Sequence, residues 1–119
     1  MPSSPSRLRV KRDGEVIIIE FIDRNILDEA NIQQIGDEVT EIIDSAKNPR
    51  LLVSFSGVDH LSSAALGTML TINNRVKAAS GELRLANIDP QIFEVFKITK
   101  LDRIFKIHET TEKAMASLK

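Results

Sequence analysis

A short apolar segment between two long amphipathic ones most constrains the fold of this chain. Residues 51–55 read Leu-Leu-Val-Ser-Phe, with little alternation of polar and apolar side chains. Such a run is typical of a central strand that is covered on both faces. Residues 28–47 before it and 63–79 after it carry apolar side chains at steps of three and four, which predicts helices. A buried strand between two such helices indicates helices packed on a sheet.

The rest of the chain continues the alternation. Residues 7–11 alternate basic and apolar side chains, as a charged edge strand does, and Asp13-Gly14 predicts a tight turn into a second strand over 15–22. Further along, we expect a strand over 82–86, a helix from Asp89-Pro90, a short strand containing Ile104, Phe105 and Ile107, and a last helix ending at Leu118. The predicted class is α/β, a single domain whose mixed sheet has four to five strands, an opening hairpin and about four helices packed against it.

Length and charge exclude several classes of function. The chain has 119 residues, enough for one domain, and its sixteen basic and seventeen acidic residues give a net charge of −1. This balance lacks the basic surface of a nucleic-acid binder or of a polybasic membrane anchor. The longest stretch without a formal charge, residues 60–74, is shorter than the roughly twenty apolar residues of a membrane span. We expect a soluble, cytoplasmic protein that binds neither nucleic acid nor membrane, with a flexible tail over 1–7 and one domain over 8–119.

Metal and cofactor chemistry find little support in the sequence. Cysteine is absent, and His60 and His108 lie far apart without ligand spacing around either. The five glycines are scattered singly and form no phosphate-binding loop. A small hydrolase using Ser63 and His60, with Asp59 as their neighbour, is the least favoured hypothesis, because adjacent side chains tend to point apart and the GxSxG elbow is absent.

Two serines stand where the second helix is predicted to begin. The first N–H groups of a helix lack intrahelical partners and carry the positive end of its dipole, so Ser62 or Ser63 is a good N-cap. A phosphate would also be well tolerated there. Small residues follow at Ala64, Ala65 and Gly67. They either leave this corner open to a partner or let the helix pack closely on the sheet.

Residues 58–67, Val-Asp-His-Leu-Ser-Ser-Ala-Ala-Leu-Gly, resemble the signature of the STAS domain of bacterial anti-sigma-factor antagonists, where a strand and loop run into Asp-Ser-Ser/Thr-Gly-Leu-Gly at a helix start. Other stretches agree. Ile26-Leu27-Asp28 resembles the Leu-Asp step into the family's first helix, and residues 80–87 resemble its Gly-Gly-x-Leu-x-Leu strand. Residues 90–118 resemble its C-terminal third, so the resemblance covers nearly the whole chain.

This resemblance implies a non-enzymatic protein without a cofactor that binds an anti-sigma factor and so frees a sigma factor. In the family, the partner is a serine kinase that phosphorylates the serine after the signature aspartate, and a phosphatase restores binding. By position, the phosphoacceptor here is Ser63. The expected partner-binding residues are Asp28, Asp59, His60, Ser62, Ser63, Ala64, Ala65 and Gly67. The balanced charge fits a monomer or a weak homodimer.

Two positions depart from the family signature. Ser62 replaces the aspartate before the acceptor, and Ala65 replaces the glycine two positions after it. The first change removes a carboxylate from the acceptor loop, and the second adds a methyl group. These departures motivate an alternative function, a constitutive and unphosphorylated STAS scaffold or regulatory module of a stress-signalling or transport complex.

Overall fold

The computed structural model describes residues 7–118, in which strands and helices alternate as the apolar pattern predicts. Residues 1–6 of the predicted tail lie outside the described residues. In chain order the elements are β1 Leu8–Asp13, β2 Val16–Phe21, β3 Asn25–Ile26, α1 Glu29–Asp44, β4 Arg50–Ser54, β5 His60–Leu61, α2 Ser63–Ala78, β6 Glu82–Ala86, α3 Pro90–Ile98, the 3₁₀ helix η1 Leu101–Arg103, β7 Ile107–His108 and α4 Thr111–Leu118.

The main sheet has five strands in the order β1-β2-β4-β6-β7. The opening hairpin β1-β2 is antiparallel, and every other neighbouring pair is parallel. Each parallel step is made through a helix, as parallel strands require a crossover connection. The predicted α/β class, the mixed five-stranded sheet, the opening hairpin and the four helices are therefore confirmed.

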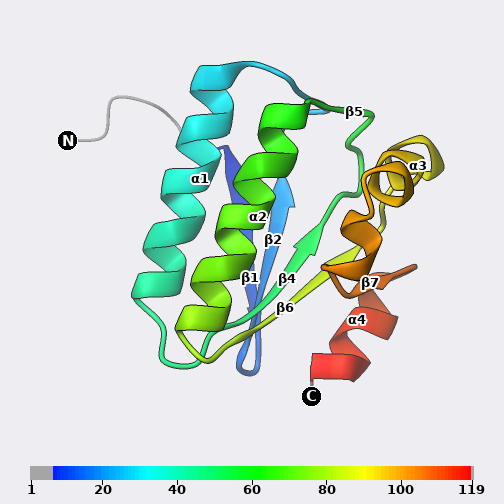
Figure 1. Ribbon diagram of the computed structural model, residues 1–119. Helices are drawn as coiled ribbons and strands as arrows, with labels where there is room; N and C mark the ends of the chain where they lie inside the picture. The colour runs from blue at the N-terminus through cyan, green and yellow to red at the C-terminus, as the bar shows by residue number, and fades with distance from the viewer. Residues whose placement is uncertain (1–6, 119) are drawn as a thin grey trace.

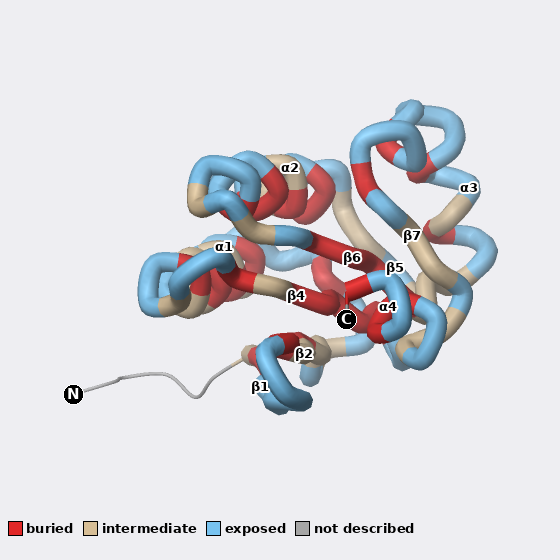
Figure 2. Tube along the Cα trace, turned by 90° about the horizontal axis from the view of Figure 1, so that it is seen from below, coloured by how far each residue is buried: buried red, intermediate tan, exposed pale blue. Residues whose placement is uncertain are grey.

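Helices cover the two faces of the sheet unequally. α1 and α2 lie side by side over one face, and α4 lies against the other (Figures 1 and 2). The larger core fills the first face and includes Ile19, Leu51 and Phe96; the smaller core joins Leu52 to Met115 of α4. β4 contributes Leu51 to one core and Leu52 to the other, which explains its nearly continuous apolar run. Among residues 7–118, no helix is long and apolar enough to cross a membrane.

The predicted helix starts are correct because a side chain caps each of them. Asp28 accepts hydrogen bonds from the N–H groups of Ala30 and Asn31 at 2.8 and 3.2 Å. Asp89 accepts one from Gln91 N–H at 2.8 Å, with Pro90 in the first helical position. These bonds satisfy donors that would otherwise lack partners at a helix N-terminus.

The prediction of a strand containing Ile104 and Phe105 is wrong. Lys100 adopts a left-handed conformation with φ of 63°, and the chain then makes a helical turn in which Phe105 N–H donates to the Leu101 carbonyl at 3.0 Å. Leu101 and Phe105 are four residues apart, so this turn buries both. Ile104 points outward, and only Ile107 and the residue after it form the strand β7.

The predicted edge strand is found at the edge of the sheet. β1 pairs only with β2, and its Lys11 lies 3.4 Å from the Glu20 carboxylate across the pair. Val10, expected on the apolar side, is 44% exposed because a strand at the edge has a neighbour on one side only. Arg7, which the sequence placed in the tail, donates from its backbone N–H to Glu38 and from its guanidinium to Asp23.

Candidate functional site

A two-residue parallel ladder joins the segments that precede α1 and α2. β3 pairs with β5, so Asn25 lies opposite His60 and Ile26 opposite Leu61. The Ser62 N–H extends this ladder by donating to the Ile26 carbonyl at 3.1 Å. Because both strands run in the same direction into helices, the N-termini of α1 and α2 lie at the same corner of the molecule (Figure 1). Asp28 and Ser63 each follow this ladder by two residues, Asp28 as the N-cap of α1 and Ser63 as the first residue of α2.

The two serines at this corner have different environments. Ser62 is the N-cap of α2, and its hydroxyl accepts a hydrogen bond from Ala65 N–H at 3.2 Å. Ser63 is the first residue of the helix and is exposed, and its hydroxyl makes no hydrogen bond with any residue from 7 to 118. The first turn of α2 holds no acidic residue. The capping function and an accessible hydroxyl therefore reside on separate serines.

An ion pair links the loop that leads into β5 to the segment that leads into β3. The Arg24 guanidinium donates to Asp59 Oδ2 from Nη2 at 2.6 Å and from Nε at 3.0 Å. The backbone repeats the link, since Asp59 N–H donates to the Arg24 carbonyl at 2.8 Å. No sequence pattern marks Arg24, because its importance depends on the β3-β5 pairing and two-residue strands leave no periodic signal.

An exposed leucine also belongs to this corner. Leu27 lies between β3 and the Asp28 cap and is 54% exposed. It directly follows β3, as Ser62 directly follows β5. The sequence does not mark Leu27 as a surface residue, because the Leu-Asp step alone does not determine which way the leucine side chain points.

The small residues of α2 divide between the surface and the core. Ala64 and Gly67 are exposed, and a Cβ added at Gly67 would meet nothing within 4 Å. Ala65 is only 4% exposed, so its methyl group faces the interior and is not accessible to a partner. Helical spacing explains the division, because positions 63, 64 and 67 share one side of the helix while 65, 66 and 69 share the other.

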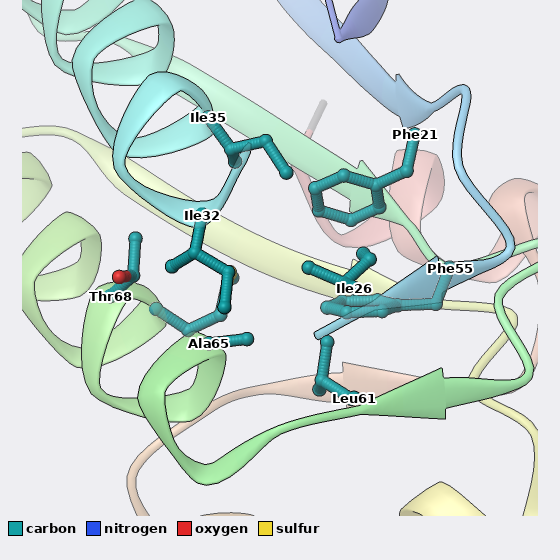
Figure 3. Close-up of a pocket in the computed structure, with 9 residues that line it drawn as sticks. Phe21, Ile26, Ile32, Ile35, Phe55, Leu61, Ala65 and Thr68 are labelled. Atoms are coloured by element: carbon teal, nitrogen blue, oxygen red, sulfur yellow. The ribbon is translucent and has the colours of Figure 1, made fainter. Parts of the chain in front are cut away.

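Beneath the corner lies a small apolar cavity of about 10 Å³ (Figure 3). A volume near that of one water molecule, without polar partners for it, is too small and too apolar to be a ligand site. The cavity is instead a small packing gap where the β3-β5 ladder and the helices α1 and α2 meet above the main sheet. Its lining comprises Phe21, Ile26, Ile32, Ile35, Phe55, Leu61, Ala65, Thr68 and Met69.

The side chains expected for a hydrolase do not form a relay within residues 7–118. Asp59 is directed to Arg24, and no hydrogen bond joins His60 to Asp59, Ser62 or Ser63. The same residues contain no group of three His, Cys, Asp or Glu side chains that could hold a metal ion. What the corner presents is a solvent-facing helix N-terminus with a free hydroxyl, bordered by the cap of a second helix.

The fold and this corner belong to a known family of domains. The model of the STAS domain matches residues 7–114, and the chain is therefore a member of the STAS domain family. One curated relative is named as the anti-sigma factor antagonist BtrV of Bordetella bronchiseptica; it is 28% identical over 96 residues, which are 81% of this chain and 82% of the relative. Another, from Thermotoga neapolitana, is named as a homologue of the anti-sigma factor antagonist TM1081 and is 33% identical over 63% of this chain and 66% of its own.

Solved structures share the fold at lower sequence identity. A STAS domain protein from Planctomyces limnophilus has a TM-score of 0.84 and 22% identity, and covers 93% of this chain and 97% of its own. The Bacillus SpoIIAA in its phosphorylated form has a TM-score of 0.70 and 20% identity, and covers 94% of this chain and 99% of its own. The family resemblance expected from residues 58–67 is thus confirmed for the chain as a whole.

Replacing Ser62 is expected to show how much its capping hydrogen bond contributes to the stability of the domain. Ser62→Ala should lower the free energy of unfolding by about 1 kcal/mol, because the Ala65 N–H loses its acceptor. Ser62→Asp, which restores the family's carboxylate, should keep the cap and the stability. Urea denaturation of both variants measures the free energy of unfolding. Ser63→Ala is the control, because it removes a hydroxyl that does not cap the helix. Equal stability of Ser62→Ala and the parent would contradict the assignment of Ser62 as a stabilising N-cap of α2.

Proposed function

We propose that this protein is a cytoplasmic anti-sigma-factor antagonist that binds an anti-sigma factor with serine kinase activity and so releases a sigma factor. The observation that carries the proposal is the exposed, unbonded hydroxyl of Ser63 at the first position of α2. Membership of the STAS family and relatives named as anti-sigma factor antagonists support it.

The switch we propose is reversible phosphorylation of Ser63. The anti-sigma factor would supply ATP, whose γ-phosphoryl group passes to Ser63 Oγ; the hydroxyl proton and ADP leave, and a phosphatase later hydrolyses the ester. The helix N-terminus would favour the added negative charge, so the domain would keep its fold. The same charge and its hydration would oppose docking of the partner.

The docking surface follows from which side chains the corner exposes. It comprises Asp28, Asp59, His60, Ser62, Ser63, Ala64 and Gly67. Ala65 is left out because its methyl group lies in the core. Leu27 is added, since an exposed leucine next to the two helix starts offers apolar contact area. The role of the domain is to bind, and the chemistry of phosphoryl transfer would reside in the partner.

A constitutive scaffold is the second candidate. It is favoured by Ser62, which stands in the place of the family's aspartate and whose hydroxyl is already engaged as the α2 cap. An acceptor loop without that carboxylate offers a kinase one fewer negative group. In this alternative the same surface would bind other STAS proteins without modification.

Mass spectrometry of the protein isolated from its own cells distinguishes the two candidates. We expect a fraction of the intact protein to carry one phosphate, and fragmentation to place it on Ser63. A chromosomal Ser63→Ala strain should lose that modified form, while a Thr71→Ala strain, altered at an exposed hydroxyl on the same helix, should retain it. Unmodified protein under all growth and stress conditions would instead support the scaffold.

A further inference from the structure

A polar pocket lies at the opposite end of α2 from Ser63. It has a volume of about 160 Å³ and lies between the C-terminal half of α2, the first residues of β6 and the turn before β7. Its lining shares no residue with the docking surface described above. The lining comprises Asn73, Val76, Lys77, Gly81, Glu82, Leu83, Arg84, Ile104 and Lys106.

Arg84 brings a largely buried positive charge to this pocket. Its side chain is 9% exposed, and Nε donates to Ser117 Oγ at 2.9 Å. Nη1 donates to Glu82 Oε1 at 2.9 Å and to the Leu83 carbonyl at 3.0 Å. Nη2 makes no hydrogen bond within residues 7–118 and is not sealed from solvent, so one side of the guanidinium is open to a group that enters the pocket.

Asn73 presents a second polar group that has no partner within the described domain and is open to the pocket. It is 6% exposed on α2, and its carboxamide has no hydrogen-bond partner in the described part of the chain. The carboxamide is absent from the sealed polar atoms of residues 7–118, so what remains exposed of Asn73 includes its polar end. It can therefore donate to or accept from a polar group that enters the pocket.

The edge of β6 adds a backbone donor. Glu82 N–H donates toward β4, to the Pro49 carbonyl at 2.8 Å, and Leu85 N–H donates to the other side, to the Lys106 carbonyl at 3.0 Å. N–H groups alternate in direction along a strand, so Leu83 N–H points to the same side as Leu85 N–H. β7 first pairs at Leu85, which leaves the Leu83 N–H facing the pocket edge without a strand beside it.

The charges around the pocket favour an anion. Lys77, Arg84 and Lys106 supply three positive charges, and Glu82 is the one acidic residue in the lining. The Arg84 hydrogen bond holds the pKa of Glu82 below its usual value, so this carboxylate is ionised at neutral pH and already occupies one side of the guanidinium. Two positive charges remain in excess, beside the free Nη2.

We propose that this pocket binds a small oxyanion, a carboxylate or phosphate group, between Arg84 Nη2, the Asn73 carboxamide and the Leu83 N–H. Lys77 and Lys106 are exposed lining residues, and Lys106 Nζ lies 3.9 Å from Glu82 Oε1, so the two lysines would contribute attraction rather than orientation. The exposed Ile104 would contact the organic part of such a ligand. The proposal is independent of phosphorylation at Ser63, because the two surfaces lie at opposite ends of α2 and share no residue.

Nuclear magnetic resonance titration of the isolated full chain tests the proposal, with inorganic phosphate and butyrate as separate probes at constant ionic strength. We expect saturable shifts of the Leu83 amide, the Asn73 side-chain amide and the Arg84 Nε–H. Saturation by phosphate alone identifies a phosphate site, saturation by butyrate alone a carboxylate site, and saturation by both a general oxyanion site. Shifts that increase without saturation for both probes would mean that the pocket holds only water, and would overturn the proposal.

Matched variants distinguish specific binding in the pocket from general attraction of an anion to surface lysines. Asn73→Leu keeps the number and branching of the side-chain heavy atoms but removes both polar groups, and should raise the Kd about tenfold while the domain stays folded, which thermal unfolding checks. Lys106→Gln should raise the Kd about threefold, as expected for an exposed charge in the lining. Lys97→Gln, the same charge change on α3, should leave the Kd unchanged. If Asn73→Leu binds as tightly as the parent, the proposal fails.

Discussion

Replacing Ser63 by aspartate is expected to weaken binding to the anti-sigma factor at least about tenfold, while Ser63→Ala binds as the parent does. Ser63 is exposed at the first position of α2, so the new carboxylate would remain at the docking surface with its hydration shell. A tenfold loss corresponds to about 1.4 kcal/mol of binding free energy. Titration calorimetry with the purified partner measures both variants against the parent.

The same substitution should not weaken the fold. A carboxylate in the first turn of a helix interacts favourably with the helix dipole, by about 0.3–1 kcal/mol at low ionic strength. Ser63→Asp should therefore unfold at an equal or higher urea concentration than the parent. Thr71→Glu, which adds one charge to the exposed side of the same helix two turns away, controls for charge alone and should bind normally. Equal affinities of Ser63→Asp and Ser63→Ala would falsify the switch.

Truncating Phe55 is expected to have the largest effect on stability. Its side chain is buried directly after β4, and its ring centroid lies 5.2 Å from that of Phe21. Phe55→Ala should lower the free energy of unfolding by about 3–5 kcal/mol, because it removes an aromatic side chain and enlarges a cavity that already exists beneath the β3-β5 ladder. Urea denaturation with a constant m-value measures the loss.

The Phe55→Ala prediction has a surface variant as its control and a consequence for partner binding. Val95→Ala, at an exposed position of α3, should change stability by no more than about 0.5 kcal/mol. Because Phe55 supports the ladder that precedes α2, Phe55→Ala should also weaken partner binding at temperatures where the domain is still folded. A loss below about 1 kcal/mol would show that the corner collapses around the cavity and does not depend on this ring.

Much of the architecture followed from local pattern. The apolar stripes over 28–47 and 63–79 correspond to α1 and α2, although α1 ends at Asp44, where Ser45 takes the C-cap. Caps such as Asp28 and Asp89 act within three residues of their acceptors, so the sequence alone contains the whole interaction. The position of Ser63 at a helix start was predictable for the same reason.

The wrong prediction near the C-terminus has an equally local cause. The apolar spacing in this segment fits both a strand and a helix. Phe105 and Ile107 are two residues apart, as on one face of a strand, whereas Leu101 and Phe105 are four apart, as on one face of a helix. The left-handed Lys100 and the burial of Leu101 with Phe105 select the helical turn, and Phe96 receives the Phe105 ring at a centroid distance of 5.9 Å. Short apolar segments are ambiguous in this way, because too few residues are present to define a period.

The sequence by itself determined the helices, the central strand, the charged edge strand and the family. Only the tertiary structure decided what each side chain at the functional surfaces faces. The β3-β5 pairing brings Arg24 to Asp59 and brings the helix starts at Asp28 and Ser63 to one corner, and helix packing turns Ala65 inward. Likewise, the Asn73 carboxamide lines a pocket only because α2 packs beside the first residues of β6. Caps and periodicity act between near neighbours along the chain, whereas burial and charge pairing depend on segments that folding brings together.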